Sequence, residues 1–81
     1  MDYVLTQHAR DALAKRQIRE EWVDIAMRNP TWAEMDAIDP LLEHRLAPIG
    51  EFGNRVLRVI VNAQTKPWRI VTAYFDRRRT A

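Results

Sequence analysis

The amino-acid sequence predicts an α+β domain in which an N-terminal helical hairpin packs on one face of an antiparallel sheet of three or four strands. Two observations predict this class. Apolar residues recur at helical spacing through the first 30 residues. Segments rich in β-branched residues then follow at 55–61 (RVLRVIV) and 68–75 (WRIVTAYF). Short connections between the later segments favour a meander, with the hairpin covering one face.

The helical hairpin is defined by local signals. Thr6 is a plausible N-cap for the first helix, because its hydroxyl can accept hydrogen bonds from the free amides of the first turn. That helix should run for about ten residues, and Gln17 and Ile18 then form a short turn. The second helix spans residues 20–28, where acidic side chains in the first turns suit the helix dipole. Pro30 ends it, because the residue before a proline avoids the helical region.

The remaining chain is expected to form strands. A weak strand covers residues 31–38, and a second covers 43–49 and leads into a glycine-containing turn at 50–53. The strongest pair, 55–61 and 68–75, is joined by a turn and runs antiparallel.

Alternation along the last two strands separates two faces. The apolar face should meet the helices, whereas the other carries Arg58, Thr72 and Tyr74 among Val56, Ile60 and Ile70. That second face can bind a planar anionic ligand, or it is a half-wetted sheet face with amphipathic residues. The predicted core consists of Leu13, Trp22, Val23, Met27, Leu57, Val59, Val61, Val71 and Phe75.

Length and composition predict one globular domain over residues 1–76, followed by a basic C-terminal tail at 77–81. The chain contains no cysteine, which favours a reducing compartment. It has no basic-then-apolar leader, and no apolar run approaches the ~20 residues of a membrane span. We therefore expect a cytoplasmic protein without membrane contact.

Charge is distributed unevenly along the chain. Residues 1–43 carry five Lys or Arg against nine Asp or Glu, whereas residues 44–81 carry eight against two. Eleven of the 13 basic residues are arginine, the side chain suited to bidentate phosphate contacts. The second half therefore predicts an anionic partner such as nucleic acid, although a GC-rich genome also produces arginine-rich chains.

Four segments carry a resemblance to a known family: LTQHARDALAKRQI (5–18), V.....NP (23–30), RVLRVIV (55–61) and IVTAYFD (70–76). Together they resemble the small bacterial family called domain of unknown function 4258, which is itself similar to the RelE and BrnT ribonuclease toxins. The resemblance implies a RelE-like fold, metal-independent RNA cleavage and a cognate antitoxin as partner. Gln17 and Arg19 depart from the family pattern, which has Gly and Ser or Thr at these positions.

RNA cleavage by 2′-hydroxyl attack needs a base, cations for the charge that develops on phosphate, and an acid for the leaving oxygen. His8 is expected in the first helical turn, where the dipole favours the neutral, basic imidazole. The candidate catalytic residues are His8, Arg58 and Tyr74, and the candidate substrate-binding residues are Arg10, Arg45 and Thr72.

Simpler interpretations stay open for these residues. His8 is also an ordinary polar residue at a helix start, and Arg10 is also a solvated side chain on the other flank of the apolar stripe. His44 and Arg45 are neighbours in a strand, so only one of them can face a site, and the sequence does not decide which. The sequence has no His/carboxylate metal spacing and no glycine-rich phosphate loop, so neither metal nor cofactor is expected.

Two functions follow from these patterns. One is a toxin-like, metal-independent endoribonuclease whose partners are RNA and an antitoxin protein. The other is a non-catalytic module that binds nucleic acid or protein on the same fold. A homodimer is compatible with either function.

Overall fold

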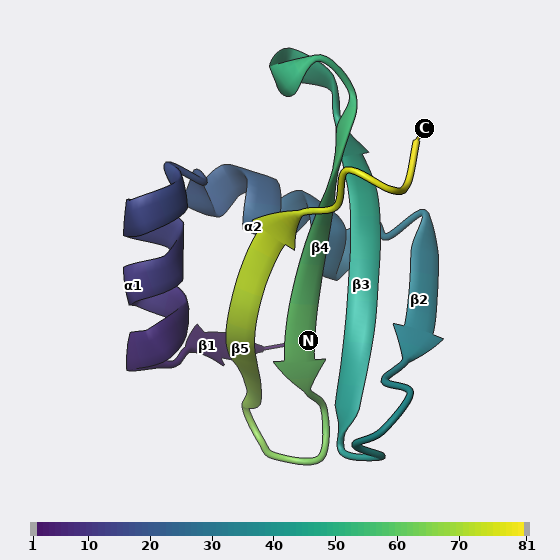
Figure 1. The fold of residues 1–81 in the computed structure, drawn as a ribbon. Helices are drawn as coiled ribbons and strands as arrows, with labels where there is room; N and C mark the ends of the chain where they lie inside the picture. The colour runs from purple at the N-terminus through teal and green to yellow at the C-terminus, as the bar shows by residue number, and fades with distance from the viewer. Residues whose placement is uncertain (1, 81) are drawn as a thin grey trace.

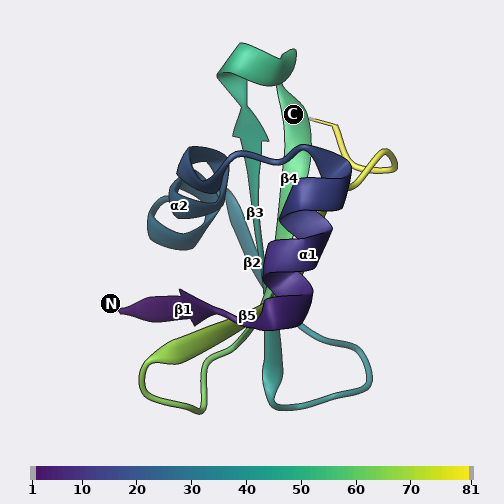
Figure 2. The same ribbon diagram turned by 90° about the vertical axis from the view of Figure 1, so that its left-hand side faces the viewer.

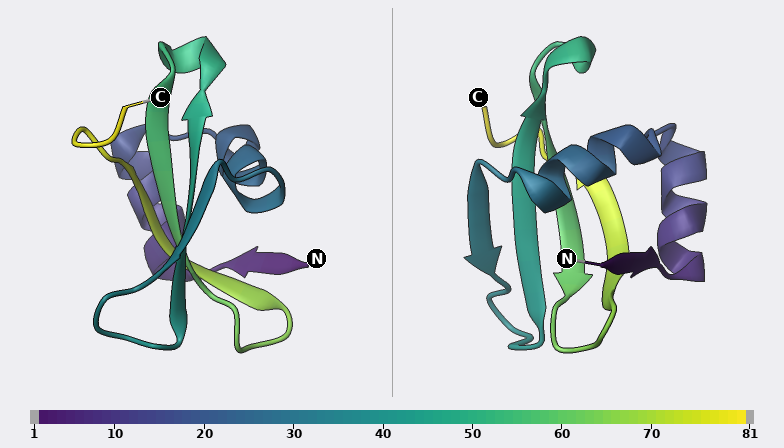
Figure 3. Two further views of the ribbon diagram at one scale, coloured as in Figure 1. Left: turned by 90° about the vertical axis from the view of Figure 1, so that its right-hand side faces the viewer. Right: turned by 180° about the vertical axis from the view of Figure 1, so that it is seen from behind.

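Two helices and a five-stranded mixed sheet form the α+β fold. The computed structural model describes residues 2–80. The elements, in chain order, are β1 (Tyr3–Leu5), α1 (Gln7–Arg16), α2 (Glu20–Arg28), β2 (Trp32–Met35), β3 (Leu42–Ile49), the 3-10 turn η1 (Gly50–Phe52), β4 (Arg55–Asn62) and β5 (Trp68–Phe75). In Figure 1 strands β5, β4, β3 and β2 lie side by side, and Figures 2 and 3 show α2 crossing one face of the sheet while α1 lies beside β5.

The sheet has the strand order β1-β5-β4-β3-β2. Strands β2 to β5 pair antiparallel, as the sequence predicts. Strand β1 pairs parallel with β5, with Tyr3 opposite Trp68. The prediction of a purely antiparallel sheet of three or four strands is therefore wrong in this detail. Three residues are too few to show strand alternation, so β1 gave no signal of its own.

The helical hairpin is confirmed. Thr6 caps α1 by accepting a hydrogen bond at its hydroxyl from the Ala9 amide, at 3.1 Å. Gln17 ends the helix in the left-handed region with φ of 55°, the conformation that glycine adopts most easily. Arg19 precedes α2 without a side-chain capping bond, and Pro30 follows its end.

The core lies between the helices and one face of the sheet, and its register differs from the prediction at one point. A β-bulge at Ile60 and Val61 shifts the β4–β5 register. Ile60 therefore pairs with Thr72, and the next residue, Val61, pairs with Ile70, which leaves Val71 without a partner in β4. Ile70 is therefore fully buried, whereas Val71 is only half-buried. The assignment of Val71 to the core, and of Ile70 to the opposite face, is wrong because simple alternation ignores the extra residue. The buried cluster comprises Ala9, Leu13, Ile18, Trp22, Val23, Ala26, Met27, Ala47, Ile49, Leu57, Val59, Val61, Ile70 and Ala73, with Phe75 packed against it.

The segment after β5 returns over the sheet. In Figure 1 it crosses from β5 toward β3, and Figure 2 places it on the side of the sheet away from α2. Asp76 is buried, and its amide donates to the Val56 carbonyl. Arg79 lies over the ring of Trp32 and forms an ion pair with Glu34 at 2.8 Å. Within residues 2–80, neither helix is long and apolar enough to cross a membrane.

Candidate functional site

The face of the sheet opposite α2, which we call the open face, carries Arg58, His44, Thr72 and Tyr74. The register aligns Leu46, Arg58 and Tyr74 across β3, β4 and β5. The next row on the same face contains His44, Ile60 and Thr72. Arg58, Thr72 and Tyr74 therefore share one face of the sheet, which the sequence predicts.

Arg58 is the centre of a buried polar network on this face. Its Nε and Nη2 donate to Oδ2 of Asp76 at 3.1 and 2.7 Å, and both residues are buried. The Arg58 hydrogen bonds lower the pKa of the Asp76 carboxyl, and the backbone amide of Arg78 lowers it further. Nη1 of Arg58 approaches Nδ1 of His44 at 2.7 Å and Oε1 of Glu34 at 3.7 Å. The guanidinium is thus almost fully committed to neighbouring residues.

His44 connects this network to the loop between β2 and β3. Its Nε2 lies 2.7 Å from Oδ1 of Asp36. Because a guanidinium can only donate, Nδ1 of His44 must accept from Arg58, and the imidazole proton then resides on Nε2. Bonds from the Asp39 amide, the His44 ring and the Ile38 amide lower the pKa of Asp36 to about 2. His44, not Arg45, faces the open side of the sheet, which decides the alternative that the sequence left open.

Arg45 lies on the opposite face, where its side chain contacts other residues of the fold. Its Nε donates to the carbonyl of Met27 at 3.1 Å, near the end of α2. Its Nη1 pairs with Glu43, and the guanidinium lies 5.5 Å from the ring centre of Trp68. The structure therefore separates Arg45 from Arg58, although the sequence groups them in one site.

His8 occupies a second region, on the exposed side of α1. It lines a shallow depression of about 240 Å³ together with Asp11, Ala12, Lys15 and Arg16. The imidazole makes no hydrogen bond to any residue in the described range 2–80. Arg16 donates from Nη1 to Oγ1 of Thr72 at 3.3 Å and to the Ala73 carbonyl at 3.2 Å. This guanidinium joins the His8 depression to β5.

The other candidates lie apart from His8 to different degrees. Arg10 is exposed on α1 and lines a separate depression with Leu5, Leu13 and Glu20. Tyr74 is half-buried, and its hydroxyl has no hydrogen-bond partner within residues 2–80. Over the same range, no hydrogen bond or ion pair joins His8 to Arg58 or Tyr74.

Sequence reasoning missed three residues that define these two regions. Asp76 continues the alternation of Thr72 and Tyr74 by two residues, so the strand pattern could have placed it beside Arg58. Arg16 lies eight residues after His8, a little over two helical turns, and this spacing could have grouped them. Asp36 gave no comparable signal, because its contact with His44 depends on the conformation of a loop. Residues 2–80 contain no group of three or more His, Cys, Asp or Glu side chains placed to hold a metal ion.

Comparison with known proteins identifies one family. A family model described as Domain of unknown function (DUF4258) matches residues 5–75. The matched range includes His8, Arg16, His44, Arg58 and Tyr74, and it ends one residue before Asp76. The searches of curated proteins and of solved structures returned no significant match. Because the family model covers most of the chain, the protein belongs to the DUF4258 family.

Proposed function

We propose that the protein is a toxin-like, metal-independent endoribonuclease with a RelE-like fold. One observation carries the proposal. The unpartnered imidazole of His8 shares a depression with Asp11, Lys15 and Arg16, so a base lies with two cations and one carboxylate. Metal-independent cleavage of RNA requires a base and cations, because negative charge collects on the phosphate while a proton leaves the 2′-hydroxyl.

The proposed reaction uses groups that have hydrogen-bonding capacity to spare. His8 takes the 2′-hydroxyl proton while that oxygen attacks the neighbouring phosphorus. The bond from phosphorus to the 5′-oxygen breaks, which leaves a 2′,3′-cyclic phosphate. A water molecule donates the proton to the leaving oxygen, because Tyr74 lies on the open face outside the His8 depression. Lys15 and Arg16 stabilise the charge on the phosphate, and Arg16 is already oriented by Thr72.

Arg58 has a different role in this proposal. Its donors are committed to Asp76 and His44, so it acts as a positioning residue that fixes the open face. Arg10 and Arg45 lie outside the proposed site. RNA is the proposed substrate, and an antitoxin that covers the open face is the proposed protein partner.

A second candidate is a non-catalytic module that binds nucleic acid or protein on the same face. Saturation of Arg58 favours the protein-binding form of this module, because the guanidinium at the centre of the open face offers almost no free donor to a phosphate.

A cleavage assay with defined oligonucleotides distinguishes the two functions. The purified protein should cut a labelled RNA to products with 2′,3′-cyclic phosphate ends, and it should not cut the same sequence with 2′-deoxyribose throughout. His8→Ala should lower the single-turnover rate about 100-fold, as expected for loss of a general base. Arg10→Ala is the matched control, because Arg10 is an exposed side chain on the same helix outside the depression. RNA binding without cleavage would favour the binding module, and equal rates for wild type and His8→Ala would refute the site.

A further inference from the structure

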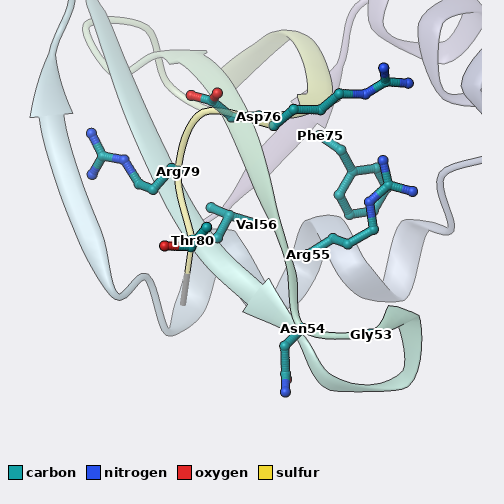
Figure 4. A pocket seen from close by; sticks show the side chains of 9 residues that line it. Gly53, Asn54, Arg55, Val56, Phe75, Asp76, Arg79 and Thr80 are labelled. Carbon is teal, nitrogen blue, oxygen red and sulfur yellow. The ribbon is translucent and has the colours of Figure 1, made fainter.

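A second cavity lies at the far end of the sheet, between the turn that precedes β4 and the C-terminal segment. It encloses about 440 Å³, and its walls include Asn54, Arg55, Phe75, Arg77 and Thr80. Figure 4 shows Arg55 with its guanidinium beside the ring of Phe75. None of these residues lines the His8 depression, so the cavity is a separate site.

Arg55 is held by aromatic rings instead of by a carboxylate. Its guanidinium carbon lies 5.1 Å from the ring centre of Phe52 and 5.5 Å from that of Phe75. Those rings are themselves 4.9 Å apart and both contact Trp22, which fixes them against the core. Ring contacts orient a guanidinium but leave its N–H groups unbonded.

Arg77 also retains its full donor capacity. Within residues 2–80, neither Arg55 nor Arg77 forms an ion pair or a side-chain hydrogen bond. The carboxylate in the cavity wall belongs to Asp76, whose oxygens are taken by Arg58 and by the Arg78 amide. Arg79 lines the wall as well, but its guanidinium is committed to Glu34 and points away from Arg55 in Figure 4. The cavity therefore contains two uncompensated positive charges.

We propose that this cavity binds the phosphate group of a nucleotide, with Arg55 and Arg77 as its two guanidinium contacts. A planar guanidinium presents paired N–H donors that match two phosphate oxygens, and it is less strongly hydrated than an ammonium group. Prior orientation of Arg55 by the two rings lowers the entropy lost on binding. The phosphate can belong to a free nucleotide or to an RNA backbone, and the site does not depend on RNA cleavage.

Titration of the full-length protein with three probes tests the site. The probes are inorganic phosphate, adenosine 5′-monophosphate and a 2′-O-methyl RNA octamer, which cannot undergo 2′-hydroxyl attack. The variants are Arg77→Ala and Arg55→Lys, and Arg10→Ala is the exposed-arginine control. Because the Arg77 side chain forms no ion pair or hydrogen bond within residues 2–80, its removal should leave the fold intact. A thermal melt of the variant verifies this. Arg55→Lys keeps the charge but removes the paired donors.

The expected result is binding of at least one probe, weakened roughly tenfold by Arg77→Ala and by Arg55→Lys but not by Arg10→Ala. If the octamer is the natural type of ligand, Arg77→Ala should also reduce the salt dependence of its binding by about one counterion. If the mononucleotide binds and the octamer does not, the phosphate source is a free nucleotide. Absence of binding for all three probes, or binding that both variants leave unchanged, would overturn the proposal. The cleavage assay with His8→Ala reports on the His8 depression, and titration of Arg77→Ala with inorganic phosphate reports on this cavity, so failure of the cleavage site and failure of this cavity are distinguishable.

Discussion

Arg58 of β4 donates two hydrogen bonds to a single carboxylate oxygen of Asp76, which lies just beyond β5. Both side chains are buried on the face of the sheet that α2 leaves open. The pair therefore attaches the C-terminal segment to the middle of the sheet. Loss of this buried pair should lower the stability more than loss of a surface ion pair does.

We predict that Asp76→Ala lowers the free energy of unfolding by about 3–5 kcal/mol, because it leaves the Arg58 charge buried without a partner. Urea unfolding followed by circular dichroism measures the change. Arg78→Ala is the control: its side chain is 89% exposed, and its removal should change the stability by less than about 0.5 kcal/mol. The double variant Arg58→Met, Asp76→Leu should cost less than the sum of the single changes. Additive costs would contradict the role assigned to the pair.

Acid should destabilise the protein through Asp36 and Asp76. The pKa of Asp36 falls to about 2 in the folded protein, and that of Asp76 is also lowered, whereas an unfolded aspartate titrates near ~3.9. Between these values the unfolded chain binds more protons than the folded protein, so stability is fully present above about pH 4 and falls as the pH approaches 2. Thermal midpoints measured from pH 5 to pH 2 report this decline. Asp36→Asn should make the decline shallower, and an unchanged slope in this variant would contradict the assignment.

Because of the β-bulge, we predict that two valines which simple alternation places in the same core lose unequal amounts of unfolding free energy when each is replaced by alanine. Val59→Ala should lower the free energy of unfolding by about 2–3 kcal/mol, because the side chain is fully buried under the helices. Val71→Ala should cost clearly less, because the bulge leaves Val71 half-buried. Chemical unfolding of the two variants under the same conditions provides the comparison. Equal costs would mean that both side chains belong to the core.

Local signals explain which parts of the fold were predictable. Thr6 caps its own helix and Pro30 follows the end of the next one, so both helices were placed correctly. Strand β1 was missed because its three residues gain their conformation from pairing with β5, more than 60 residues away. The inversion of Ile70 and Val71 has a similar origin, since a bulge is set by the partner strand as well as by the chain that contains it.

For the candidate site, the sequence predicted which residues share one face of the sheet, but not the contacts that they make. Alternation grouped Arg58, Thr72 and Tyr74 correctly because it needs no knowledge of distant segments. It could not show that Asp76 would neutralise Arg58, or that Arg16 would reach Thr72 from α1. Which cations remain available to a ligand depends on such pairings, and these appear only in three dimensions.

The parallel pairing of β1 with β5 has a consequence for synthesis on the ribosome. Helix α1 packs chiefly on β5, so it emerges from the exit tunnel long before the surface that it will cover exists. The apolar side chains of α1, such as Ala9 and Leu13, therefore stay exposed to solvent until residues 68–75 have been translated. Nascent chains that expose apolar surface in this way are substrates for chaperones. A chain stalled before residue 68 should therefore remain largely unfolded and sensitive to protease, and the fold should form as one cooperative unit once β5 becomes available.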